Sequence, residues 1–354
     1  MKKHTLNIFR ILLLCMILYS CSKDENETLE EGVISGTENV IVLSNTARVI
    51  GYLPYYRFSL SNEISFCKLT HLNLAFANID ENANLIFPSS SEGTTIEAII
   101  ARAKVRNPQI QIFISLAGGG VNEAQRDYWR TYIDQQEERA ILIEKILQFV
   151  TTYNLDGVDL DLEWDNITAG YSAFVLELST KLKENAISLS AAYPSETKYN
   201  YLSKEALEVL DFVNIMAYDY TGPWNATNVG PHSSFNHAQR GINFWSKQPS
   251  IAPIDLNLGV PFYGYDFQNG TVVAKTYASI IKENPEAADS DQVWNLYYNG
   301  GPTIRAKTIR AAEKVGGIMI WELGQDALNE YSLLEIIHQT YSELEVSTSD
   351  ACEN

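Results

Sequence analysis

The chain has 354 residues, a formal net charge of −18 at pH 7 and 45% hydrophobic residues. This length and apolar content suffice for a large buried core, and a single α/β barrel of about 250 residues fits within them. An acidic surface disfavours nucleic acid and anionic substrates and is compatible with a neutral polymer such as a glycan, although acidity that serves only solubility explains the charge equally well.

Residues 1–20 predict a signal peptide. The apolar run 11–19 follows basic residues and is too short to span a bilayer as a stable helix. The next residues, Leu18-Tyr-Ser-Cys21, resemble a bacterial lipobox, in which the cysteine becomes the lipidated first residue of the mature protein. The resemblance implies lipidation of Cys21 and membrane attachment through that lipid alone.

Residues 21–46 predict an acidic, flexible tether. The acidic run 22–27 directly after Cys21 resembles the surface-export signal of lipoproteins in the Bacteroidetes. It implies an exported bacterial lipoprotein anchored at the outer membrane and the cell surface. A plain secretion signal followed by an ordinary hydrated tether is the alternative.

From residue 47 to residue 345, apolar strand-like runs alternate with amphipathic helical patterns. Eight runs predict strands, at 49–53, 71–77, 110–115, 157–162, 187–192, 212–217, 256–260 and 317–321. Six stretches predict helices, at 96–105, 137–150, 174–183, 204–210, 237–245 and 303–314. This alternation predicts a single-domain (β/α)₈ TIM barrel. The remaining residues, 346–354, predict a disordered tail.

Four cysteines are present, of which Cys15 lies in the signal peptide and Cys21 is the lipid site. Cys67 lies in an apolar stretch that predicts a small buried residue, and a disulfide from it to Cys352 remains open. The spacing of the cysteines indicates no metal site, and we expect no metal and no cofactor.

Three acidic residues occupy alternate positions at the end of the fourth predicted strand: Asp159, Asp161 and Glu163. Side chains on alternate positions share one face, about 7 Å apart along the chain, and the intervening residues are aliphatic. The aliphatic face suits the covering helices, so the acids face the barrel axis. Their mutual repulsion raises some of their pKa values, and a proton held on the outermost, Glu163, would make it a general acid.

A solvated sheet edge would not place aliphatic residues at every other position. A Ca²⁺ or Mg²⁺ site is the sharper alternative for three acids, but no Asn or His cluster nearby completes such a shell. The pattern therefore favours catalysis over metal binding.

The segment Asp156-Gly-Val-Asp159-Leu-Asp161-Leu-Glu163 is similar to the complete D-G-x-D-x-D-x-E signature of family 18 glycoside hydrolases, which are chitinases and endo-β-N-acetylglucosaminidases. Other strand ends resemble the same family over residues 48–340. They are Gly51-Tyr52, Met216-Ala-Tyr218-Asp219, Gly222-Pro-Trp224, Gly259-Val-Pro-Phe-Tyr-Gly264 and Trp321-Glu322.

The resemblance implies a retaining mechanism in which the N-acetyl group of the substrate is the nucleophile. Glu163 would be the acid and then the base, Asp161 would orient the acetamide, and Asp159, flanked by Ser115 and Tyr52, would share the charge. Tyr218 would hold the acetamide oxygen. The implied substrate-binding residues are Trp321 as the floor, Asp219, Trp224 as a stacking platform, Tyr52, Ser115 and Met216.

Departures from the family pattern lie around the acid rather than at it. Ala117 replaces a glycine, Trp164-Asp165 follows Glu163, and Tyr265 stands where many chitinases have arginine. The segment 267–315 is too short for a separate domain. The chain is therefore expected to lack a large α+β insertion domain and to have a shallow, open groove.

These observations predict a monomeric enzyme that cleaves N-acetylglucosamine-containing glycans. The first reading is a chitinase-like hydrolase of β-1,4-linked N-acetylglucosamine polymers, and the second is an endo-β-N-acetylglucosaminidase that cuts the chitobiose core of N-glycans. A non-catalytic glycan-binding lipoprotein is the third, and it is disfavoured because Glu163 is present.

Overall fold

The computed structural model describes residues 40–87 and 95–348, which all belong to one unit. The predicted signal peptide, Cys21 and Cys352 lie outside the described residues. Among the helices that are described, none has the length and apolar character needed to cross a bilayer.

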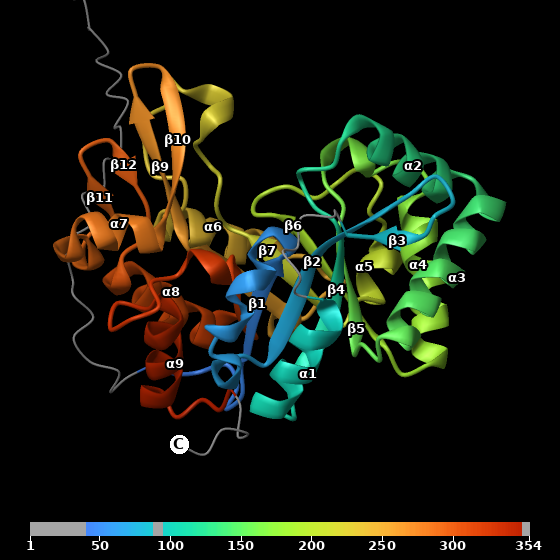
Figure 1. Cartoon of the computed structure of the whole chain (residues 1–354), viewed down its shortest axis with the longest axis horizontal. Coiled ribbons are helices and arrows are strands. Elements are labelled where there is room, and N and C mark those ends of the chain that lie inside the picture. Colours follow the sequence, from blue (N-terminus) through green and yellow to red (C-terminus); the bar gives the residue numbers. More distant parts are fainter. Residues whose placement is uncertain (1–39, 88–94, 349–354) are drawn as a thin grey trace, which may run out of the picture. The chain divides into compact units, whose positions relative to one another are not determined.

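Eight parallel strands close into a barrel (Figure 1), which confirms the predicted (β/α)₈ fold. The strands are β1 (Arg48–Pro54), β2 (His71–Ile79), β4 (Gln111–Ala117), β5 (Gly157–Asp161), β6 (Ser188–Pro194), β7 (Phe212–Met216), β8 (Leu256–Pro261) and β13 (Gly317–Trp321). Strand β1 pairs with both β13 and β2, which closes the ring. All eight strands coincide with predicted runs to within two residues.

The six predicted helices are present: α1 (Ile96–Arg106), α3 (Gln136–Thr152), α4 (Tyr171–Glu184), α5 (Lys204–Glu208), α6 (Phe235–Trp245) and α8 (Gly301–Lys314). Three further helices are α2 (Glu123–Asp134), α7 (Tyr277–Glu283) and α9 (Leu333–Glu343). A capping box starts α2, because Asn122 accepts from the backbone N–H of Gln125 while the Gln125 side chain bonds back to Asn122.

The two faces of the strands separate the core from the site. The aliphatic residues Val158 and Leu160 of β5 are fully buried and belong to the same core cluster as Phe174 and Leu178 of α4. Asp159, between them, is also fully buried but belongs to the barrel interior. The alternation of side chains along β5 therefore places the acids inside the barrel, as predicted from the sequence.

A small α+β insertion lies between β8 and β13, where the sequence predicts only that a large insertion domain is absent. The insertion contains a second, antiparallel sheet and the helix α7, which follows β10. The four strands of this sheet are β9 (Tyr263–Gln268), β10 (Thr271–Thr276), β11 (Gln292–Val293) and β12 (Leu296–Tyr297). Figure 1 shows it in orange beside the barrel. Two of these strands are only two residues long, too short to give a periodic signal, so the sequence pattern did not predict this second sheet.

The folded unit extends slightly beyond its predicted bounds. Thr46 forms a parallel bridge with Ser347, and the backbone N–H of Leu43 donates to Ala312 at 2.7 Å. Val346 is 4% exposed. The last residues of the predicted tether and the first of the predicted tail therefore pack on the barrel. Cys67 lies in a short 3₁₀ helix and is half-buried rather than fully buried.

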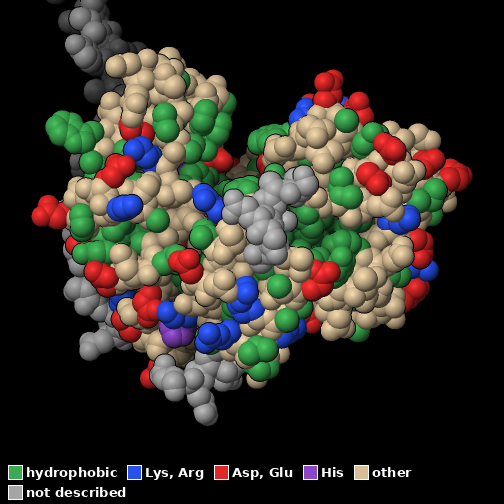
Figure 2. All heavy atoms as spheres, in the orientation of Figure 1, with side chains coloured by type: hydrophobic (Ala, Val, Ile, Leu, Met, Phe, Trp, Pro, Cys, Tyr) green, Lys and Arg blue, Asp and Glu red, His purple; other side chains and the backbone are tan. Residues whose placement is uncertain are grey.

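Acidic side chains dominate one part of the surface. In Figure 2 they gather over α2 and α3, with few basic groups among them. The exposed members are Glu123, Asp127, Asp134, Glu137 and Glu144. This surface lies on the two helices, and the acids at the end of β5 are a separate group.

Candidate active site

Asp159 is the most completely hydrogen-bonded carboxylate of the barrel interior. Its Oδ2 accepts from the hydroxyls of Tyr52 and Ser115, both at 2.7 Å, as the sequence predicts. Its Oδ1 accepts from Ser190 at 2.6 Å and from Asn214 at 3.4 Å. Burial raises the pKa of Asp159, and the donors oppose that shift. Four donors on one buried carboxyl group favour its ionised form.

Asp161 has fewer partners. It is 4% exposed, and its Oδ1 has no hydrogen-bond partner among the described residues. Burial raises the pKa of Asp161 well above its ordinary value, and the charges of Glu163 and Asp159 add to the shift. Asp161 therefore holds a proton more readily than Asp159 does, and its free oxygen is available to a bound molecule.

Glu163 lies just beyond the end of β5. Burial raises its pKa to about 7, with a further contribution from the charge of Asp219. The sequence predicts a raised pKa through repulsion among the three acids, whereas burial is the larger cause here. A β-carbon at Gly119 would lie 2.8 Å from Glu163 Oε1, so the absence of a side chain there leaves room for the carboxyl group.

Aromatic rings form the floor beside these acids. Trp321, at the end of β13, stacks on Phe76 with ring centroids 5.3 Å apart and meets the edge of Tyr52 at 5.8 Å. Tyr218 follows β7, and burial together with the charge of Asp161 raises the pKa of its hydroxyl well above the ordinary value. Tyr218 is therefore a hydrogen-bond donor at any ordinary pH.

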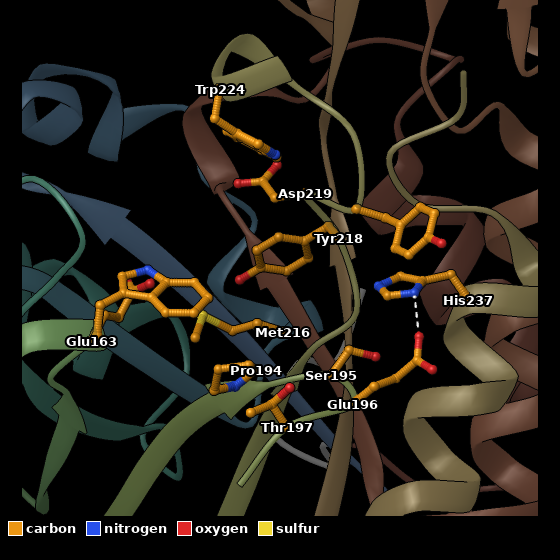
Figure 3. Close-up of a pocket in the computed structure, with 12 residues that line it drawn as sticks. Glu163, Pro194, Ser195, Glu196, Thr197, Met216, Tyr218, Asp219, Trp224 and His237 are labelled. Atoms are coloured by element: carbon orange, nitrogen blue, oxygen red, sulfur yellow. Dashed lines mark hydrogen bonds and ion pairs between the residues drawn. The ribbon is translucent and has the colours of Figure 1, made fainter. Parts of the chain in front are cut away.

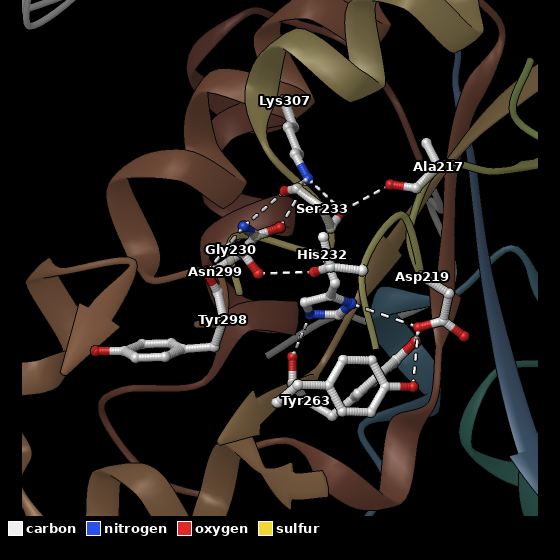
Figure 4. A network of polar contacts seen from close by, with 11 residues as sticks. Ala217, Asp219, Gly230, His232, Ser233, Tyr263, Tyr298, Asn299 and Lys307 are labelled. Carbon is white, nitrogen blue, oxygen red and sulfur yellow. Dashed lines mark hydrogen bonds and ion pairs between the residues drawn. The ribbon is translucent and has the colours of Figure 1, made fainter. Parts of the chain in front are cut away.

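Asp219 is held by residues that the sequence did not single out for this role. Its Oδ1 accepts from Tyr263 at 2.5 Å and from Tyr265 at 3.1 Å, and it lies 3.4 Å from His232 Nδ1 (Figure 4). The tyrosine that departs from the family pattern at position 265 thus contacts Asp219. Both tyrosines come from β9, so the insertion contributes directly to the site.

A buried lysine supports the loop that carries His232. The Nζ of Lys307, which is fully buried, donates to Ser233 O at 2.7 Å, to Ser233 Oγ at 2.8 Å and to Asn299 Oδ1 at 2.7 Å. Ser233 Oγ in turn donates to Ala217 O, two residues before Asp219. Figure 4 shows this chain of contacts running from α8 to Asp219.

Two cavities meet at the acid. The first cavity has a volume of about 640 Å³, and the residues that line it include Asp161, Trp321, Tyr55, Tyr56 and Gln125. The second has a volume of about 700 Å³, and the residues that line it include Trp164, Trp224, Glu196 and His237. Glu163, Met216, Tyr218 and Asp219 line both. Figure 3 shows the second cavity, with Glu163 and His237 on opposite sides. Glu163 therefore stands where two halves of one groove join.

The structure brings together every residue that the sequence nominates within the described ranges. Tyr52, Ser115 and Asp159 lie beneath the groove as one hydrogen-bonded group, and the others line a cavity. Trp224 is 60% exposed at the rim. In residues 40–87 and 95–348, no three His, Cys, Asp or Glu side chains gather as a metal site.

Four further residues of the site were not predicted from the sequence: Ser190, Asn214, Tyr263 and His232. Ser190 and Asn214 could have been predicted, because each is a polar residue at an inward-facing position of an otherwise apolar strand, as Asp159 is. The other two depend on the insertion and on a loop between β7 and α6, whose positions follow from the tertiary fold.

Comparison with known proteins adds to this geometry. The family model described as "Glycosyl hydrolases family 18" matches residues 48–326. The crystal structure of the GH18 chitinase ChiB from the chitin utilization locus of Flavobacterium johnsoniae is 47% identical, with a TM-score of 0.85, and the match covers 88% of this chain and 99% of that one.

Curated relatives are more distant. Probable chitinase 10 of Drosophila melanogaster is 26% identical over 278 residues, which are 69% of this chain and 12% of that protein. The class V chitinase of Arabidopsis thaliana is 26% identical over 234 residues, which are 60% of each protein. The match thus spans less than two thirds of the length of either curated relative.

Proposed function

Because this chain belongs to family 18 of the glycosyl hydrolases, we propose that it hydrolyses β-1,4-linked N-acetylglucosamine polymers such as chitin or its oligosaccharides. One observation carries the proposal: Asp161, Glu163 and Tyr218 line a single cavity together with Trp321. The 47% identical structure is a chitinase from a chitin utilization locus, which supports this substrate class.

In the proposed mechanism, the sugar at the cleavage point rests on Trp321 and its own acetamide is the nucleophile. The hydroxyl of Tyr218 donates to the acetamide oxygen, and Asp161, which has a free oxygen, binds the acetamide N–H. The acetamide oxygen attacks the anomeric carbon as the glycosidic bond breaks. Positioning an internal nucleophile in this way supplies much of the rate enhancement.

Glu163 transfers its proton to the glycosidic oxygen, so the leaving sugar departs as a neutral alcohol. The remaining sugar becomes an oxazolinium ion, whose positive charge lies beside Asp161 and Asp159. Water then attacks the anomeric carbon, the Glu163 carboxylate accepts the proton of that water, and the configuration is retained. Asp159, with its four donors, holds negative charge while Asp161 is engaged with the acetamide.

The test is product analysis with and without the acid. Purified protein is incubated with chitin oligosaccharides and, in parallel, with a high-mannose glycoprotein, and the products are separated. We expect cleavage of the oligosaccharides and a loss of about 10²–10⁴-fold in kcat for Glu163→Gln, the contribution typical of a general acid. The matched control is Asp165→Asn, because the Asp165 side chain is 77% exposed and belongs to neither cavity.

Three outcomes would contradict the proposal. Activity on neither substrate would remove the enzymatic function, and activity that survives Glu163→Gln would remove the assigned acid. Cleavage of the glycoprotein alone would move the chain to the endo-β-N-acetylglucosaminidases.

We further propose that the protein is exported and anchored by a lipid on Cys21. The support is the signal-like segment 1–20 and the lipobox-like sequence around Cys21. Labelling of cells with a radioactive fatty acid is expected to mark the wild-type protein and not Cys21→Ala. An unlabelled wild-type protein in the medium would indicate plain secretion instead.

A further inference from the structure

In the cavity that is lined by Trp224 and not by Trp321, one wall carries a hydrogen-bonding atom that has no partner among the described residues. That wall consists of the loop after β6 and the first turn of α6. His237 on α6 is 4% exposed, and its Nε2 has no hydrogen-bond partner among the described residues. His237 lines the cavity, and Figure 3 shows its ring on the side opposite Glu163. A buried polar atom without a partner at a cavity wall indicates a place for a ligand.

The neighbours of His237 fix which of its ring nitrogens carries the proton. Glu196 Oε1 lies 3.0 Å from His237 Nδ1, and a carboxylate accepts hydrogen bonds only. Arg240 Nε donates to both oxygens of Glu196, at 3.1 and 3.0 Å, and although burial opposes it, Arg240 holds the pKa of Glu196 below its ordinary value. The proton therefore lies on Nδ1, and Nε2 presents a lone pair to the cavity.

The imidazole is also neutral. Burial lowers the pKa of His237 to about 4. Arg240 Nη2 approaches Nδ1 at 3.3 Å, which is longer than the contact with Glu196 and adds a positive charge that disfavours a second proton on the ring. A neutral ring with its N–H directed at Glu196 is an acceptor, and it suits a hydroxyl or an amide N–H of an uncharged ligand.

The wall is built before any ligand arrives. Ser234 Oγ caps α6 by accepting from the backbone N–H of His237 at 3.1 Å. One turn further on, a β-carbon at Gly241 would lie 2.4 Å from Ser195 Oγ, so the glycine lets α6 pack closely against the loop after β6. The cap of α6, the hydrogen bond to Glu196 and the close packing of α6 at Gly241 therefore fix the ring of His237, which lowers the entropic cost of binding.

The arrangement of the two cavities tells which half of a substrate meets His237. Asp161 and Trp321 line the other cavity, so the sugar whose acetamide reacts lies there, and Glu163 lines both. A proton delivered by Glu163 reaches the oxygen between this sugar and the next one. The next sugar, which leaves, must therefore enter the cavity of His237, where Trp224 offers an exposed apolar ring face at the rim.

We propose that the His237–Glu196 pair is a specificity-determining site for the leaving part of the glycan, in which Nε2 of His237 accepts a hydrogen bond from a hydroxyl or acetamido N–H of a leaving sugar. This inference rests on the proposed function. The cavity then offers a polar contact at His237 in addition to its aromatic rim, and this contact favours a sugar leaving group over an apolar one.

The experiment compares two substrates that differ in the leaving group. Chitopentaose places sugars in the cavity of His237, whereas 4-nitrophenyl chitobioside releases nitrophenol, which has no hydroxyl beyond the scissile oxygen. His237→Asn keeps a donor near Nδ1 for Glu196 and removes Nε2. We expect kcat/KM on chitopentaose to fall about tenfold, the effect of one lost hydrogen bond with a partner left unsatisfied, and to fall several times less on the nitrophenyl substrate.

Two further variants separate recognition from structure. His237→Gln retains a polar acceptor near the position of Nε2 and should recover a part of the loss on chitopentaose. Glu196→Gln keeps the size of the side chain, but its amide can meet Nδ1 with either an N–H or a carbonyl oxygen, so the proton is no longer confined to Nδ1. The variant should therefore show a part of the selective loss of His237→Asn.

Equal losses on the two substrates, or no loss on chitopentaose for either His237→Asn or Glu196→Gln, would overturn the inference. Thermal melting of each variant identifies a folding defect, and Glu196→Gln keeps the test valid if His237→Asn does not fold. Inactivity of the wild-type protein on both substrates would instead overturn the proposed function.

Discussion

At the scale of single residues, the site assigns different protonation states to three chemically similar acids. Asp159 has four hydrogen-bond donors, Asp161 has a free oxygen, and Glu163 lies at the border of two cavities with a pKa of about 7. Burial acts on all three, so the number of donors decides which one carries the charge. Asp161 and Glu163 therefore hold a proton more readily than Asp159 does, and of these two Glu163 faces the scissile bond.

This assignment predicts the alkaline limb of the pH profile. The Glu163 carboxyl group must be protonated to act as an acid, and its pKa is raised to about 7, so kcat/KM should fall about tenfold per pH unit above pH 7. Because the charge of Asp219 contributes to the shift after burial, Asp219→Asn should move the midpoint of this limb to lower pH. The measurement is kcat/KM on a chitin oligosaccharide from pH 5 to 9. A limb that stays at the same pH in the variant, or moves upward, would contradict this electrostatic coupling.

At the scale of elements, strand β5 requires a glycine at its start. A β-carbon at Gly157 would lie 2.4 Å from the ring of Phe113, which fills the barrel interior on the neighbouring strand β4. The glycine of the acidic signature is thus explained by packing and not by chemistry. It lets an aromatic ring fill the barrel beneath the carboxylates.

We therefore expect Gly157→Ala to lower the free energy of unfolding by about 1–3 kcal/mol, the cost of overpacking a well-filled core. The matched control is Gly230→Ala, because nothing lies within 4 Å of a β-carbon at Gly230. Urea unfolding of both variants checks the prediction. A Gly157→Ala protein as stable as the control would show that Phe113 moves aside without cost.

The eight barrel strands could be predicted because each is a mostly apolar run with few polar residues, and the acids of β5 could be placed because side chains alternate strictly along a strand. The insertion could not, since β11 and β12 each have only two residues. One signal for it was present: Asn269-Gly270 has positive φ at both residues, 46° and 87°, which is the turn typical of a tight hairpin, and it joins β9 to β10.

The support of Asp219 could not be predicted either. Tyr263, His232 and Lys307 come from the insertion, a loop and α8, and only the closed fold brings them together. The same holds for His237 and Glu196, which belong to different elements and meet across the cavity wall. Sequence patterns report what one strand or helix does, whereas contacts between distant elements follow from the packing of the whole barrel.

At the scale of the whole molecule, the active site lowers stability at neutral and alkaline pH. A buried carboxyl group with a raised pKa favours folding while it is protonated, and the advantage is lost when the pH rises and the unfolded chain releases the proton first. For Glu163, the relevant window runs from its ordinary pKa of 4.5 to about 7 in the folded protein. Below this window the group is protonated in both states and has no pH-dependent effect.

Glu163→Gln removes this ionisation while keeping the shape of the side chain. We expect the variant to be more stable than the wild-type protein at pH 8, by about 2 kcal/mol after allowance for solvent screening, and to match it at pH 4. Thermal and urea unfolding at the two pH values provide the measurement, with Asp165→Asn as the exposed control that should not differ from wild type at either. An inactive Glu163→Gln protein that gains nothing at pH 8 would show that the carboxyl group is not strained in the fold. A gain in the free energy of unfolding at pH 8 but not at pH 4 would show that Glu163 lowers the stability of the fold in favour of activity, as is common in enzymes.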